Sequence, residues 1–234
     1  MPLTEIALTP ALWALLAGLG GLLAVDGVSM PQVMISRPIV SATIGGALLG
    51  DAAGGMLVGA LLELLTMRHP PYGAAKYPDT GPAGLIAGCA YAASGTPSIA
   101  ILVAAVLVGW MTGWMGAYTG YARRLVNGRL IGRPEWLAAD PRRLERRHRS
   151  AIAIDALRGV VLTGGLLVPS VLIVSVVGVM PVGEVGTAFG SAAVVTALAA
   201  SIGSGARTTA PDARAWAMVL LGALLVLAAL WGRP

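Results

Sequence analysis

Three carboxylates lie in a part of the chain that is otherwise almost entirely apolar. Asp51 and Glu63 are twelve residues apart in a run of Leu, Ala and Gly, and Asp79 follows a polar segment that contains Pro70 and Pro71. A charged residue at membrane depth costs roughly 2.5–3.5 kcal/mol on insertion scales, so it is by default a candidate for function. The two prolines lack N–H groups and interrupt any helix that enters them, which leaves backbone groups in need of polar partners.

Each carboxylate also has a structural explanation. Asp51 precedes "AAGG" and could cap a helix start, where a side-chain oxygen accepts hydrogen bonds from free backbone N–H groups. Glu63 lies inside "GALLELL" with no local cap to make, so its alternatives are an ion pair, for instance with Arg68, or contact with a ligand. Asp79 follows Pro78 and could occupy a turn or a cap. We therefore expect Glu63, of the three carboxylates, to matter most for ligand binding.

Several ligands would suit such carboxylates. A carboxylate can accept hydrogen bonds from two neighbouring sugar hydroxyls, and exposed loop backbone can complete the set. Carboxylates also bind cations and relay protons, so residue chemistry alone leaves sugar, ion and proton open. The single cysteine, Cys89, excludes an internal disulfide and a Cys-based zinc site, and its apolar surroundings predict a small packing residue.

Composition places these residues in a membrane protein. The 234 residues are 56% hydrophobic and 12% charged, whereas soluble domains carry about 25% charged residues. The 32 glycines suit close packing of helices in lipid. The first ten residues contain no Lys or Arg, so we expect the first apolar stretch to remain as a span rather than to serve as a cleaved signal peptide.

The apolar stretches predict an all-α, polytopic membrane protein that has full spans plus short re-entrant or discontinuous helices. A full span takes about 20 residues, and segments 11–25 and 85–94 are too short for this. Residues 38–67 fit two half-length pieces that meet near Asp51. The remaining candidates are Ile99–Tyr118, Val160–Met180, Val185–Ile202 and Trp216–Trp231. Short pieces need protein or a water-filled cavity around their backbone, and transporters build substrate sites from them.

One polar segment, Tyr121–Ser150, interrupts this single membrane domain of residues 1–234. It contains nine of the sixteen Lys and Arg residues and only three acids. Between two spans such a segment predicts a cytoplasmic loop, because positive charge stays inside. We do not expect it to bind nucleic acid. A docking face for an acidic cytoplasmic partner and a contact with lipid headgroups both remain compatible with it.

A set of short motifs resembles a known family. The chain carries an Arg-Pro pair, a Gly-Asp turn, a Gly-rich helix that ends in a Glu, a Gly-Ala-Ala and a Pro-Asp. These motifs resemble the IIC membrane subunit of the mannose/fructose/sorbose class of bacterial sugar phosphotransferase systems. The matching positions here are Arg37–Pro38, Gly50–Asp51, Glu63, Gly73–Ala74–Ala75 and Pro78–Asp79. The chain departs from the family pattern at Pro71, which stands where members carry an Asn.

The resemblance implies a transport subunit of the bacterial inner membrane rather than an enzyme, with no catalytic residue, cofactor or metal. A IID-type membrane subunit would join it in a trimeric assembly that carries a hexose. Cytoplasmic IIA and IIB proteins would transfer phosphate from phosphoenolpyruvate to the sugar. The implied substrate-binding residues are Glu63, Asp79, Asp51, Gly73 and Ala74.

Two alternatives come from other classes of function. A non-transporting membrane scaffold could use the basic segment to dock soluble phosphotransfer proteins. A secondary transporter of another small solute could use Glu63 as its proton carrier. Uptake that depends on phosphoenolpyruvate would distinguish sugar phosphotransfer from proton-driven transport.

Overall fold

The computed structural model describes residues 8–29, 32–67, 76–131 and 141–181, and most positions from 183 to 199. All regular secondary structure in these residues is helical, which confirms the predicted all-α class. The main helices are α1 (Pro10–Val28), α2 (Pro38–Leu48), α3 (Ala52–Thr66), α4 (Thr80–Ala93), α5 (Ile99–Ile131) and α6 (Pro141–Val179). The predicted segment Val185–Ile202 is described only in part, and Trp216–Trp231 lies outside the described residues.

Long and short helices are both present, as the apolar stretches predicted, although α1, with 19 residues, is longer than the segment 11–25 that was predicted to be too short for a full span. Among the described residues α1, α5 and α6 are long and apolar enough to cross a membrane. The other three are shorter than the 20 residues that a full span requires. The predicted spans Ile99–Tyr118 and Val160–Met180 fall within α5 and α6, apart from Met180, which follows the last residue of α6.

Residues 38–67 form the predicted pair of half-length pieces. Helix α2 ends at Leu48 and α3 begins at Ala52, and between them Gly50 has a φ of +93°, a conformation that favours glycine. The Asp51 carboxylate accepts a hydrogen bond of 2.8 Å from the Gly54 N–H. This bond confirms that Asp51 caps a helix. Small residues then allow the two helices to pack closely, and a Cβ on Gly55 would come within 3.0 Å of the Gly46 Cα.

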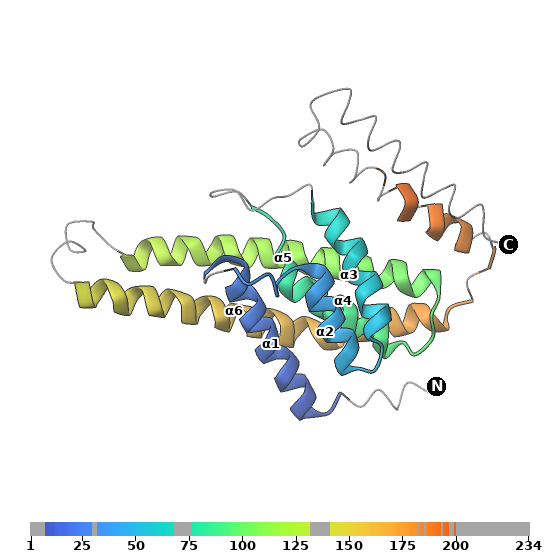
Figure 1. The fold of residues 1–234 in the computed structure, drawn as a ribbon, viewed down its shortest axis with the longest axis horizontal. Coiled ribbons are helices and arrows are strands. Elements are labelled where there is room, and N and C mark those ends of the chain that lie inside the picture. The colour runs from blue at the N-terminus through green and yellow to red at the C-terminus, as the bar shows by residue number, and fades with distance from the viewer. Residues whose placement is uncertain are drawn as a thin grey trace, which may run out of the picture.

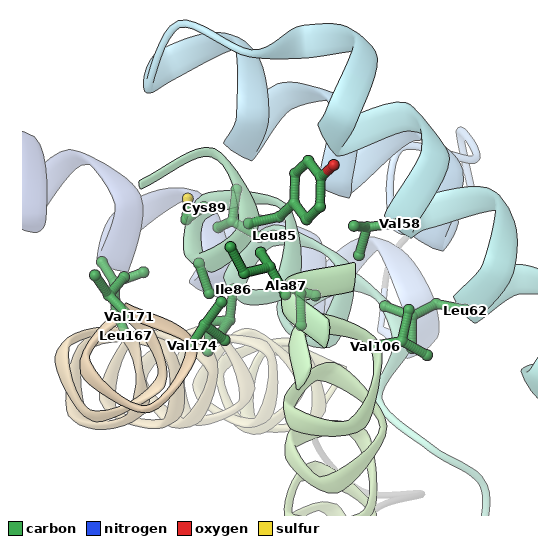
Figure 2. Packing of buried hydrophobic residues seen from close by; sticks show 14 of the residues in the cluster. Val58, Leu62, Leu85, Ile86, Ala87, Cys89, Val106, Leu167, Val171 and Val174 are labelled. Carbon is green, nitrogen blue, oxygen red and sulfur yellow. The ribbon is translucent and has the colours of Figure 1, made fainter. Parts of the chain in front are cut away.

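Helix α4 forms the centre of the fold. Every residue from Gly81 to Ala92 is buried, and α4 packs against α1, α2, α3, α5 and α6. Figure 2 shows α4 side chains, among them Leu85, Ile86 and Cys89, facing residues of α3, α5 and α6. A short helix can therefore lie at membrane depth because protein surrounds it on all sides.

The two longest helices lie side by side and extend beyond the rest of the described structure (Figure 1). With 33 and 39 residues, α5 and α6 measure about 50 and 58 Å along their axes. The polar segment Tyr121–Ser150 was predicted as a loop, but its described residues are helical, because α5 continues to Ile131 and α6 starts at Pro141. Arg, Leu and Glu are good helix formers, and each helix packs against the other.

Candidate functional site

A cavity of about 320 Å³ lies where the end of α3 and the start of α4 meet α5 and α6. Its volume is at the lower end of the range for small-molecule pockets, about 300–1,000 Å³. Much of its wall is polar. The charged side chains in that wall are Arg37, Glu63, Asp79, Arg123, Arg124 and Arg158.

Glu63 reaches the cavity from the penultimate turn of α3. Its carboxylate forms an ion pair with the Arg37 guanidinium and accepts a hydrogen bond of 3.2 Å from the Ile39 N–H. Ile39 lies in the first turn of α2, whose own cap residue, Arg37, makes no side-chain capping bond. Glu63 therefore satisfies a free N–H of a neighbouring helix, where the helix dipole favours negative charge. The expected partner Arg68 lies outside the described residues.

Asp79 occupies the N-cap position of α4, but its side chain makes no capping bond. The carboxylate instead lies 2.7 Å from the Arg158 guanidinium of α6. Its backbone N–H donates to the Gly113 carbonyl at 2.9 Å, which fixes the start of α4 against α5. The predicted alternatives, turn or cap, thus describe its backbone, while its side chain faces the cavity and is only 10% exposed.

A chain of ion pairs continues from Asp79 into the protein. Arg158 also contacts Asp155 at 2.9 Å, and Arg123 of α5 lies 3.2 Å from the same carboxylate. The Ser29 hydroxyl donates to Asp155 as well, and Asp155 is fully buried. Buried charges are tolerated when they are paired and hydrogen-bonded. Two carboxylates and two guanidinium groups therefore join α4, α5 and α6 beside the cavity.

The segment between α1 and α2 is held by a further carboxylate. Asp26, 5% exposed, accepts hydrogen bonds from the backbone N–H groups of Val33 at 2.8 Å and Ser36 at 2.9 Å. The Thr80 hydroxyl donates to the Ser36 carbonyl at 3.0 Å. These bonds place Arg37 beside Glu63.

The structure brings two of the five candidate residues to the cavity. Glu63 and Asp79 line it, whereas Asp51 does not. Asp51 lies at the opposite end of α3, about 18 Å away by helical rise. Gly73 and Ala74 lie outside the described residues.

Sequence reasoning missed the partners of the carboxylates. Asp155 and Arg158 lie between the polar segment Tyr121–Ser150 and the predicted span Val160–Met180, so neither prediction included them. A signal was available, because an acid and a base three residues apart in an apolar helix lie on one face and can neutralise each other. Arg37 was noted only as part of a motif.

The cavity offers oriented hydrogen-bond acceptors and donors in a small volume. Ion pairs with Arg37 and Arg158 hold the Glu63 and Asp79 carboxylates in place, and each carboxylate has more acceptor sites than its partners use. The four guanidinium groups of Arg37, Arg123, Arg124 and Arg158 add donors. Among the described residues no group of three or more His, Cys, Asp and Glu is arranged to hold a metal ion. This arrangement suits a small polyhydroxylated ligand.

The chain is similar to known proteins over much of its length. Residues 7–141 match the family model described as the phosphotransferase system sorbose-specific IIC component. A solved structure titled "Structure of membrane protein" is similar with a TM-score of 0.68 and 18% identity, over 94% of this chain and 87% of that one. At this identity the likeness shows the fold alone. No curated protein matches the chain.

The family match covers more than half of the 234 residues and includes Arg37, Glu63 and Asp79. Asp155 and Arg158, which complete the ion pairs, lie beyond it. The chain therefore belongs to the sorbose-specific IIC family, the sugar-specific membrane components of phosphotransferase systems of the mannose/fructose/sorbose class.

Proposed function

We propose that this IIC component holds a hexose in the cavity between α3, α4, α5 and α6, and that Glu63 and Asp79 are its main hydrogen-bond acceptors. One observation carries the proposal. These two residues lie on different helices, and both carboxylates line one small cavity and are oriented by arginines. The sorbose-specific family makes sorbose the first sugar to test.

The arginine pairs explain how carboxylates can bind a neutral sugar. A carboxylate that is paired with a guanidinium still has lone pairs for two neighbouring hydroxyls. Hydrogen bonds to charged groups contribute about 1.5–3 kcal/mol each. Gly73 and Ala74 remain proposed sugar contacts through the family resemblance, which places them between the two carboxylates in the sequence.

The proposed setting is that of a transport subunit in a bacterial inner membrane, surrounded by lipid. A IID-type membrane subunit would complete a trimeric assembly. IIA and IIB phosphotransfer proteins would phosphorylate the sugar on the cytoplasmic side. The chain itself would carry out no chemical step. Glu63 is bound by both the Arg37 guanidinium and the Ile39 N–H, which supports a fixed hydrogen-bond acceptor rather than a proton carrier.

The proposal is tested by transport in vesicles that contain the chain, its IID-type subunit and the soluble phosphotransfer proteins. We expect sugar phosphate to accumulate inside when phosphoenolpyruvate is supplied there, and to do so equally when an ionophore abolishes the proton gradient. Uptake that follows the proton gradient and ignores phosphoenolpyruvate would contradict the proposal.

A further inference from the structure

The basic ends of α5 and α6 form a surface that sugar binding does not explain. These two helix ends, residues 121–131 of α5 and 141–150 of α6, are called the arginine hairpin below. Arg142, Arg146 and Arg149 recur at spacings of four and three residues, so they lie on one face of α6. All three are exposed. The only acid in the described part of the hairpin is Glu145, which pairs with Arg149.

The position of the hairpin relative to the membrane follows from two apolar runs. Residues 99–118 of α5 and 160–179 of α6 contain no charged side chain, and each run is long enough to fill the hydrocarbon core of about 30 Å. Arg158 lies at the end of one run and donates to the Gly116 carbonyl, near the end of the other, at 3.3 Å. Both helices therefore leave the hydrocarbon at the level of Arg158.

The hairpin extends too far from this level for its outer arginines to contact lipid. Arg146 and Arg142 lie about 18 and 24 Å beyond Arg158 along the helix axis. The headgroup layer is only about 5–8 Å thick on each side, and the potential of anionic lipid falls off within a Debye length of about 8 Å. A basic surface at this height instead fits a negatively charged protein.

The inner end of the hairpin lies at the cavity. Arg123 and Arg124 belong to its α5 part, and together with Arg158 they line the cavity wall. Basic side chains therefore occur both in the cavity wall and on the outer part of the hairpin, where α5 and α6 project beyond the other described helices (Figure 1). A protein attached to the outer arginines would reach the cavity opening.

We propose that the arginine hairpin is the docking surface for an acidic cytoplasmic protein that carries a phosphorylated side chain, and that it directs this protein to the cavity. The inference rests on the proposed function, which requires a phosphate carrier next to the sugar. Arginine is well suited to phosphate through paired N–H donors. Opposite charges on two surfaces raise the rate of association and orient the partners.

The experiment measures binding of the purified, phosphorylated IIB-type protein of the same system to the assembled membrane complex in phosphatidylcholine nanodiscs. Arg142→Glu/Arg146→Glu should weaken binding about tenfold or more, mainly through slower association. Arg142→Gln/Arg146→Gln should lie between this variant and the wild type. Arg142→Lys/Arg146→Lys keeps the charge and should bind almost as the wild type does. Higher salt should weaken binding of the IIB-type protein most in the wild-type complex.

Two further measurements separate the possible outcomes. Heat stabilisation of each complex by sugar should be unchanged, since neither arginine lines the cavity. If sugar did not stabilise the wild-type complex against heat, that result would count against the sugar site and not against docking. A fluorophore on Leu144→Cys, which is exposed and lies about 21 Å beyond Arg158 along the helix axis, should respond to the IIB-type protein, and it should not respond to adding phosphatidylglycerol to the nanodiscs. Equal partner affinity in all variants, or a response to phosphatidylglycerol alone, would overturn the proposal.

Discussion

Glu63 performs two tasks with one carboxylate. It completes the hydrogen bonding at the start of α2 through the Ile39 N–H, and it presents a charge to the cavity while paired with Arg37. Gln at this position would keep an oxygen that can accept from Ile39, but it would remove the charge. Glu63→Gln therefore tests ligand binding more than folding.

We expect Glu63→Gln to weaken sugar binding by the assembled complex about tenfold or more, because hydrogen bonds to a charged acceptor are worth about 1.5–3 kcal/mol. Asp51→Asn is the matched control, since Asn also caps helices and Asp51 lies outside the cavity lining. Equilibrium binding of sorbose and mannose to both variants, after assembly has been verified, makes the comparison. If Glu63→Gln bound sugar normally and Asp51→Asn did not, Asp51 would be the ligand-binding residue and Glu63 the structural one.

Arg158 neutralises two carboxylates at once. Its removal would leave Asp79 without its cavity-side partner and would leave the buried Asp155 with Arg123 and Ser29 only. Breaking a buried pair by removing one partner costs about 3–5 kcal/mol. We expect Arg158→Met to lower the thermal stability of the complex strongly.

Adding Asp79→Asn to Arg158→Met tests whether unpaired charge causes the loss of stability. Arg158→Met/Asp79→Asn removes one of the two orphaned charges, so it should recover part of the lost stability, measured as the midpoint of heat unfolding of the purified complex. A double variant that is as unstable as Arg158→Met alone would show that packing of the long Arg158 stem, rather than charge, accounts for the loss.

At the scale of elements, the α2–α3 pair depends on the absence of side chains. A Cβ at Gly55 would meet the Ala42 carbonyl and the Gly46 Cα of the facing helix. By contrast, a Cβ at Gly165 in α6 would meet nothing within 4 Å. Replacing each glycine by alanine therefore compares a tightly packed position, Gly55, with an open one, Gly165.

Gly55→Ala should destabilise the protein by about 1–3 kcal/mol, the usual cost of forcing extra volume into a packed interface. Gly165→Ala should be neutral or slightly stabilising, because Ala is the better helix former by up to about 1 kcal/mol. Heat inactivation of sugar binding in the two variants provides the measurement. Equal loss in both would mean that helix flexibility, and not α2–α3 contact, determines the effect.

Sequence patterns predicted those elements whose signals are local. The break near Asp51 follows from a Gly-Asp pair in an apolar run that is too long for one span, and the helix cap follows from the residue type. The length of α5 and α6 was not predictable from hydropathy, because helices that continue into water lose their apolar signal at Arg123 and Arg149. The ion pair of Arg37 with Glu63 joins positions 26 residues apart, so it depends on the folded α2–α3 pair.

At the scale of the whole molecule, charge is concentrated at one end. The arginine hairpin lies at one end of α5, and the short turn before Ile99, which includes Thr96, lies at the other. About 20 apolar residues of α5 separate the two ends, so the ends face opposite sides of the membrane. The excess of arginine predicts that the hairpin faces the cytoplasm.

Labelling of single cysteines in intact cells checks this orientation. Ser150 and Thr96 are both exposed, and Cys89 is buried in the core, so background labelling should be low. A membrane-impermeant maleimide added outside should react with Thr96→Cys and not with Ser150→Cys, and Ser150→Cys should react once the cells are permeabilised. Reaction of Ser150→Cys in intact cells would place the arginine hairpin outside, where no cytoplasmic phosphate carrier could reach it. That one result would contradict both the positive-inside orientation and the docking surface, while leaving the sugar site in the cavity untouched.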